Sequence, residues 1–258
     1  MKNKYVYSFA EGDGRNKKLL GGKGANLCEM TQIGINVPPG FVISTEACLE
    51  YLDKDELPAD LLKEVKEQIQ QLEQTTGKTF GAGPDPLLVS VRSGSALSMP
   101  GMMDTILNLG LNDDTLAGLI QQTGDERFAY DAYRRFIQLF GKVALGIDDE
   151  HFDEHFNAIK AREGVKADVG LSAENLKEIS EKFLDVVRRE SGKEFPQDVM
   201  AQQQLAVESV FRSWMGKRSV DYRREIHITP EMANGTADNV CTMVFGNMGD
   251  DCATGVGF

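Results

Sequence analysis

The chain has 258 residues, of which 41% are hydrophobic and 26% are charged, and its formal net charge is −12. This composition excludes a disordered chain and predicts a globular protein with one or two hydrophobic cores. The acidic balance argues against nucleic-acid or acidic-membrane partners, because such binding needs clustered lysine and arginine.

Two further features predict a cytoplasmic protein that does not interact with membranes. No apolar run approaches the roughly 20 residues needed to span a bilayer, and the N-terminus MKNKYVYSF lacks the core of a signal peptide. The four cysteines are scattered, without paired spacing, at Cys28, Cys48, Cys241 and Cys252. This distribution argues against both structural zinc and stabilising disulfides.

The first 110 residues alternate strand-like and helix-like segments. In chain order we expect a strand at 5–9, a glycine-rich turn, a helix at 24–32, a strand at 41–44 and a helix from Thr45. Residues 58–75 follow with an apolar stripe at helical spacing, formed by Leu62, Val65, Ile69 and Leu72. This alternation predicts an α/β layer, with the amphipathic helix covering the sheet.

The segment 87–110, LLVSVRSGSALSMPGMMDTILNLG, contains the first candidate site. Residues 87–91 have the length and β-branched content of a buried strand, so Arg92 is expected at a strand end, where a rigid frame can aim its guanidinium. The glycines and hydroxyl side chains that follow suit close approach to phosphate oxygens. Helical periodicity is then expected after the loop. An ordinary glycine-rich connection accounts for the same residues equally well.

The character of the chain changes at Asp113. From there to about Gly192 the pattern is helical, with a cap predicted at Ser172. A further helix is expected at 198–226, and strands are expected at 239–245 and 254–258. Because the sequence ends within the last of these strands, we expect a truncated domain.

The segment LLGGKGANL, residues 19–27, contains the second candidate site. Its glycines and Lys23 come directly before a predicted helix, so the lysine and the amides of the helix N-terminus could both face an anion. The spacing GxxxxGK[ST] of a Walker A loop is absent. Taken alone, the segment favours a plain turn with a lysine in solvent.

Taken together, these segments resemble a known family. GGKGANL, then VRSGSALSMPGMMDTILNLG, and then TMVFGNMG are similar in order to the N-terminal nucleotide-binding domain of the pyruvate, phosphate dikinase family. The resemblance extends over nearly the whole chain, including GFVISTEAC, RFAYDAYRRFIQLF and VFRSW. Phosphoenolpyruvate synthases resemble it mainly at the shorter GGK and RS signatures.

The resemblance implies an α/β (α+β) fold of ATP-grasp type, in which two lobes close on ATP. On this basis we expect an ATP-binding subdomain at 1–112, a helical insert at 113–197, helices returning to the first subdomain at 198–238, and the start of an incomplete second lobe at 239–258. The expected partners are ATP and inorganic phosphate, together with the phosphohistidine and pyruvate domains of a longer chain. The full-length enzyme is expected to be a homodimer.

The resemblance also assigns site residues. Lys23 and Arg92 match the phosphate-contacting lysine and arginine, and Arg92 is the candidate catalytic residue. The loop that closes over the phosphates contains Gly101, Asp104 and Thr105. Met243 and Val244 align with the strand whose backbone lies near adenine, where an apolar wall suits a purine.

The implied reaction converts ATP, pyruvate and phosphate to AMP, phosphoenolpyruvate and diphosphate through a carrier histidine on another domain. Mg²⁺ is expected with ATP, but its ligands are expected beyond Phe258, so we predict a fragment that is inactive alone. An alternative is a catalytically silent nucleotide-binding or interaction module, or a protein of the phosphoenolpyruvate synthase type.

Some residues depart from the family pattern. Cys241 stands where relatives usually have glutamine beside the adenine strand, and Cys252, Ala253 and Gly257 interrupt a pattern that is usually SGTGVAF. These changes put the adenine contacts in question. None of the three histidines, His151, His155 or His227, lies in a motif that matches the carrier.

Two other patterns have competing interpretations. HFDEH, residues 151–155, satisfies the HxxEH pattern of inverted zinc proteases, but no third ligand follows in the expected context, so we predict no catalytic zinc. Met99, Met102 and Met103 could be simple packing residues; near a mobile loop they are expected to cushion its movement.

Overall fold

The centre of the molecule is a five-stranded antiparallel sheet. The computed structural model describes residues 4–247 and 251–255, and in them the strand order is β1-β2-β7-β5-β6. The strands span Val6–Ser8 (β1), Gly40–Ile43 (β2), Ala237–Thr242 (β7), Val89–Gly94 (β5) and Thr105–Leu109 (β6). A separate parallel pair joins Thr79–Phe80 (β3) to Pro86–Leu87 (β4). The middle strand of the sheet is therefore the last strand among the described residues.

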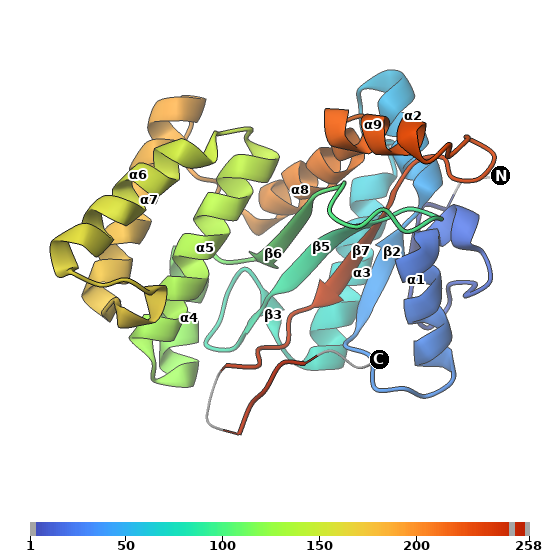
Figure 1. Ribbon diagram of the computed structural model, residues 1–258. Coiled ribbons are helices and arrows are strands. Elements are labelled where there is room, and N and C mark those ends of the chain that lie inside the picture. The colour runs from blue at the N-terminus through green and yellow to red at the C-terminus, as the bar shows by residue number, and fades with distance from the viewer. Residues whose placement is uncertain (1–3, 248–250, 256–258) are drawn as a thin grey trace.

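The helices lie on both faces of the sheet and beside its β6 edge (Figure 1). They span Lys17–Gln32 (α1), Thr45–Lys54 (α2), Leu61–Thr76 (α3), Asp113–Thr123 (α4), Glu126–Ala144 (α5), Asp149–Glu163 (α6), Ala173–Ser191 (α7), Val199–Ser213 (α8) and Lys217–Glu225 (α9), with a 3₁₀ turn at Asp168–Gly170. This mixed α/β architecture is the predicted class.

The two faces of the sheet are set by the alternation of side chains along each strand. In β2, Phe41 and Ile43 face the main core, whereas Val42 faces α1. The main core also contains buried side chains of α2, α3 and α8. The α1 face has only a small apolar cluster of its own, formed by Phe9, Leu20, Ala25, Cys28, Val42 and Ala237. We call these the core face and the α1 face.

The helices α4 to α7 form a group beside the β6 edge (Figure 1). Helix α5 packs against β6 and α7, and its buried stripe includes Phe136 and Phe140. The predicted cap at Ser172 is confirmed, because its side chain accepts a hydrogen bond from the amide of Asn175. Between 113 and 192 no residue is in a strand, as the sequence predicted.

Several predictions of secondary structure were wrong in part. The helix expected at 24–32 begins at Lys17, so the GGKG segment lies within α1 rather than directly before it. The helix expected at 198–226 is interrupted near Gly216, where α8 ends and α9 begins. The strand expected at 239–245 begins two residues earlier and ends at Thr242. Thr254 and Gly255 are not in a strand, and the rest of the strand expected at 254–258 lies outside the described residues.

A further error concerns residues 105–109. Helical periodicity was expected after the glycine-rich loop, but the segment forms β6, which pairs with β5 through Arg92 and Thr105 and through Val91 and Ile106. The reason is long-range: β6 gains a partner strand on one side and the apolar surface of α5 on the other. Tertiary packing therefore decides the structure of this short apolar segment.

Candidate functional site

The first turn of α1 is shaped by contact with β5. Gly21 interrupts the helix with φ 67° and ψ 165°, and a Cβ there would lie 1.9 Å from the carbonyl oxygen of Gly94. The next amide, that of Gly22, donates to the carbonyl of Ser95 at 2.8 Å. Only glycine allows this approach of two backbones. The predicted GGKG segment thus brings α1 directly against the end of β5.

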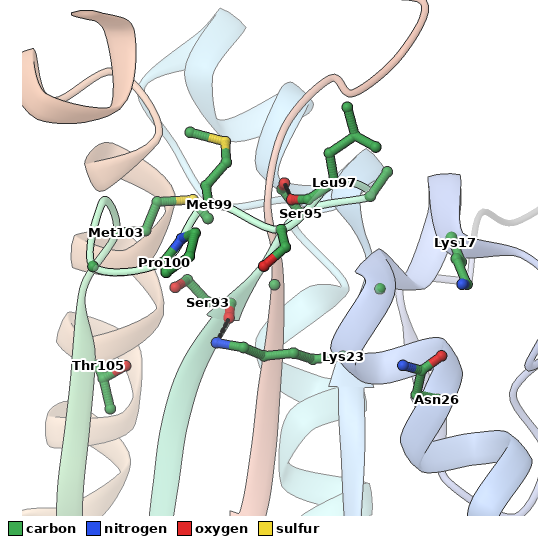
Figure 2. A pocket seen from close by; sticks show the side chains of 15 residues that line it. Lys17, Lys23, Asn26, Ser93, Ser95, Leu97, Met99, Pro100, Met103 and Thr105 are labelled. Carbon is green, nitrogen blue, oxygen red and sulfur yellow. Dashed lines mark hydrogen bonds between the residues drawn. The ribbon is translucent and has the colours of Figure 1, made fainter. Parts of the chain in front are cut away.

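Lys23 extends from α1 to the end of β5 (Figure 2). Its Nζ donates to the carbonyl oxygen of Ser93 at 3.0 Å. Partial burial and, secondarily, the charge of Arg92 lower the pKa of Lys23. The side chain is therefore held by a backbone acceptor rather than free in solvent, which excludes the plain-turn interpretation of this lysine.

Arg92 lies on the α1 face of the sheet. It is within β5 rather than at its end, because the strand continues to Gly94 and pairs Arg92 with Asn239 and Thr105. The strand was expected to end at Arg92, but it ends two residues later. Arg92 therefore has a paired strand on each side, which holds its backbone in place. Its Nε donates to Ser90 Oγ at 3.2 Å, and the side chain remains exposed. The guanidinium is thus oriented and accessible.

Two adjoining cavities meet at Lys23. One, of about 520 Å³, lies between α1 and the loop after β5, and its wall includes the hydroxyl residues Ser93, Ser95 and Ser98 (Figure 2). The other, of about 480 Å³, lies over the α1 face and is mainly apolar. Lys23 and Asn26 line both. We call them the loop cavity and the strand cavity.

The strand cavity brings together several residues that the sequence predicted. Its lining contains Arg92, Met243 and Val244, together with Cys241 and Asn239. The segment after β7 stays extended, since the amide of Met243 donates to the carbonyl of Leu88 at 2.8 Å. Burial raises the pKa of the Cys241 thiol, and its Sγ is 3.6 Å from the carbonyl oxygen of Pro38.

The loop between β5 and β6 contains the other predicted residues. Gly101, with φ 73°, and Thr105 line the loop cavity. Asp104 lines neither cavity, and its carboxylate pairs with Arg218 of α9 at 3.3 Å. Burial raises the pKa of Asp104. The structure therefore separates Asp104 from the other predicted residues of this loop.

The methionines of this loop differ in their surroundings. Met99 is only 6% exposed and belongs to the main core, whereas Met102 and Met103 are partly buried against it. In Figure 2 the side chain of Met99 extends away from Lys23. Met99 thus attaches the middle of the loop to the core.

The HFDEH segment lies in α6, within the helical group. His151 Nε2 is 3.6 Å from Glu190 of α7. Within residues 4–247 and 251–255, no three histidine, cysteine, aspartate or glutamate side chains gather as metal ligands would. The same part of the chain contains no helix that is long and apolar enough to cross a membrane.

Two residues of the site were missed in the sequence. Asn26 follows Lys23 by three positions on α1, so helical spacing alone could have placed both on one side of the helix. Asn239 lies in β7 opposite Arg92, and no local pattern marks it. Its position depends on the pairing of strands far apart in sequence.

Comparison with known proteins assigns a family to this fold and site. A family model described as "Pyruvate phosphate dikinase, AMP/ATP-binding domain" matches residues 17–61 and 52–258. The chain belongs to this family. The assignment includes both the GGKG segment and the β5 loop, and it confirms the resemblance seen in the sequence.

Curated members of the family are similar over almost the whole chain. Pyruvate, phosphate dikinase of Entamoeba histolytica is 56% identical over 254 residues, which are 98% of this chain and 29% of that protein. The protein of the same name from Clostridium symbiosum is 49% identical over 99% of this chain and 29% of its own length. That of Giardia intestinalis is 50% identical over 94% of this chain and 27% of its own. The chain thus spans less than a third of these relatives.

Proposed function

We propose that this domain binds ATP across the two adjoining cavities, with Lys23 and Arg92 contacting the phosphates. The observation that carries the proposal is the position of Lys23, which lines both an apolar and a hydroxyl-rich cavity and lies close enough to Arg92 for that charge to lower its pKa. Two fixed cations beside backbone amides suit the charge of a polyphosphate.

The chemistry of the cavities suggests an orientation for the nucleotide. The strand cavity, with Met243, Val244 and Leu27, offers apolar walls for a purine. The loop cavity, with its serines, Gly101 and Thr105, offers hydroxyl and backbone donors for phosphate oxygens. We therefore place adenine in the strand cavity and the phosphates between Lys23 and the loop. Cys241, at the base of the strand cavity, would lie beside the purine.

Mg²⁺ is proposed to accompany ATP rather than to occupy a site made by this chain. The described residues present no cluster of three or more ligands, and Asp104 is engaged by Arg218. They do not fit a resident cation. Mg²⁺ commonly keeps several waters and binds through substrate phosphates, and the described residues contribute cations, hydroxyls and backbone donors.

In the setting of a longer chain, we propose that the domain is the ATP-binding part of a pyruvate, phosphate dikinase. Its role would be to hold ATP while a phosphoryl group moves to a carrier histidine of another domain, and from there to pyruvate, with inorganic phosphate as the second acceptor. Arg92 would stabilise charge on the equatorial oxygens during the transfer. A cytoplasmic location and a homodimeric full-length enzyme belong to the same proposal.

Nuclear magnetic resonance titration of the chain with MgATP tests the site even when affinity is weak. We expect shifts in the amides of 22–26, 92–105 and 241–244. Arg92→Ala and Lys23→Ala should each weaken binding by about tenfold or more, because each removes a charged hydrogen-bond donor. Lys63→Ala, which removes an exposed cation of α3, is the matched control.

The titration has outcomes that support the proposed site and outcomes that overturn it. Shifts confined to the two cavities and lost in both site variants support the proposal. Binding with unchanged affinity after Arg92→Ala, or shifts centred on the helical group α4 to α7, would overturn the site. Comparison with AMP tests the orientation, because AMP should retain shifts at 241–244 and lose most of those at the loop.

A further inference from the structure

Asn239 occupies the centre of the α1 face. It lies in β7, between Val42 of β2 and Arg92 of β5, and it is only 2% exposed to solvent. Its side chain therefore points toward α1 from the middle strand of the sheet. Lys23 is carried by α1 and Arg92 by β5, so Asn239 lies between the elements that carry the two cations.

The amide of Asn239 fills a gap that two glycines leave open. A Cβ on Gly24 of α1 would lie 2.8 Å from Asn239 Oδ1, and a Cβ on Gly94 of β5 would lie 2.6 Å from Asn239 Nδ2. A side chain at either position would force the carboxamide to shift. The carboxamide is thus in close contact with the backbones of both elements at once.

Hydrogen bonds connect the same three elements. Asn239 Nδ2 donates to the carbonyl oxygen of Arg92 at 3.1 Å. Lys23 Nζ donates to the next carbonyl of β5, that of Ser93, at 3.0 Å. Two consecutive acceptors of β5 are therefore bound by side chains, one from β7 and one from α1. This arrangement fixes the backbone from which Arg92 extends.

Stability alone does not explain an asparagine here. Its Oδ1 is buried and accepts no hydrogen bond from any described residue. A buried acceptor without a donor is destabilising, whereas an apolar side chain of the same size would avoid that loss. The carboxamide at this position therefore points to a role in the geometry of the site.

We propose that Asn239 is a positioning residue that sets the spacing between Lys23 and Arg92. It acts through α1 and β5 and does not itself contact phosphate. The inference rests on the proposed function for its consequence in nucleotide binding, but its geometric part concerns the free protein and can be measured without nucleotide.

The test is the pKa of Lys23, measured by nuclear magnetic resonance of the lysine side-chain carbons, with Lys23→Arg to assign the signal. In Asn239→Leu the hydrogen bond to the carbonyl of Arg92 is lost. Lys23 should then move away from Arg92 and become more exposed to solvent. Its pKa should then rise toward the ordinary value. In an Arg92→Ala background the same change should produce a smaller rise, because the neighbouring charge is already absent. Asn239→Ser is a second variant, for use if leucine prevents folding.

Asp238→Asn is the matched control. Asp238 is the preceding residue of β7 and equally buried, but it faces the other side of the sheet, so the pKa of Lys23 should not change. An unchanged pKa in folded Asn239 variants, or an equal rise in Asp238→Asn, would overturn the inference. If the pKa of Lys23 rises in the Asn239 variants but their affinity for MgATP is unchanged, the positioning role of Asn239 is supported and the proposed phosphate site fails instead.

Discussion

The two faces of the five-stranded sheet differ in the side chains they carry and in the role of those side chains. The core face is apolar and continuous with α2, α3 and α8, and it includes Phe41, Val91 and Val240. The α1 face has only a small apolar cluster, and beside it the polar side chains of Arg92 and Asn239 line a cavity. One set of strands therefore supplies stability on one side and a binding surface on the other.

The difference shows why the site can be rigid without being buried. Arg92 and Val91 are neighbours in β5, yet Val91 is completely buried and Arg92 is exposed. The strand is anchored through the core face, so the guanidinium does not require an apolar environment of its own. Changes on the two faces should accordingly separate stability from affinity.

The largest effect is expected from Phe41→Ala. Phe41 is fully buried on the core face, and removal of such a ring should lower the free energy of unfolding by about 3–5 kcal/mol. Arg92→Ala, on the other face, should change it by only about 0.5 kcal/mol. Urea unfolding measures both. A loss for Arg92→Ala as large as that for Phe41→Ala would contradict this division between the faces.

A second effect concerns Asp238, the one carboxylate placed on the core face of β7. It is completely buried, neither oxygen has a partner among the described residues, and burial raises its pKa well above the ordinary value. Because the folded-state pKa is raised, stability is greatest below the unfolded pKa and falls as pH rises toward the folded pKa. Asp238→Asn should remove this fall and stabilise the protein at pH 7 by roughly 1–3 kcal/mol.

Urea unfolding from about pH 4.5 to 8 measures the effect of Asp238, because the loss of stability begins above the ordinary pKa of 3.8. The wild-type protein should lose stability across this range, whereas Asp238→Asn should be flatter. The nearby thiol of Cys48, whose pKa burial raises to about 12, stays neutral throughout and does not contribute. Asp53→Asn, at an exposed position of α2, is the control. Equal pH dependence in wild type and Asp238→Asn would show that the carboxylate is solvated.

The third effect concerns the packing of α1 on its face. A Cβ on Gly24 would lie 2.8 Å from Asn239 Oδ1 and 2.9 Å from both methyl groups of Val42, whereas a Cβ on Gly22 would have no neighbour closer than 3.5 Å. Both alanines gain helix propensity, so their difference isolates the packing. We expect Gly24→Ala to be less stable than Gly22→Ala by roughly 1–3 kcal/mol in urea unfolding. Equal stabilities would mean that α1 can move away from the sheet.

The sequence predicted the parts of the site that have local signals. Lys23 stands among glycines, and Arg92 follows an apolar run of residues. The family resemblance then joined them. The division into domains and the roles of the predicted residues remain proposals. Asp104 was predicted in the site, but its pairing with Arg218, 114 residues away, could not be read from the loop.

Features that depend on distant pairing were not predictable in this way. Asn239 bonds to Arg92 across 147 residues, and its role follows from the insertion of β7 between β2 and β5. Strand β6 was missed for the same reason, since its short segment acquires strand structure only beside β5. Local patterns identified the cations, whereas the frame that positions them is a property of the sheet.

The smallest effect is expected where the loop after β5 meets the helices behind the core face. Buried Ser219 of α9 donates to the carbonyl of Met102 at 2.8 Å, so Ser219→Ala should lower stability by about 1 kcal/mol and increase hydrogen exchange in residues 96–104. The control is Ser180→Ala, which removes a buried hydroxyl bonded within α7 and should leave exchange in the loop unchanged. Equal exchange in both variants would mean that the bond from Ser219 does not hold the loop and that its other contacts, such as the ion pair of Asp104 with Arg218, suffice. The expected result would instead make the loop the element that ties the binding face to the core.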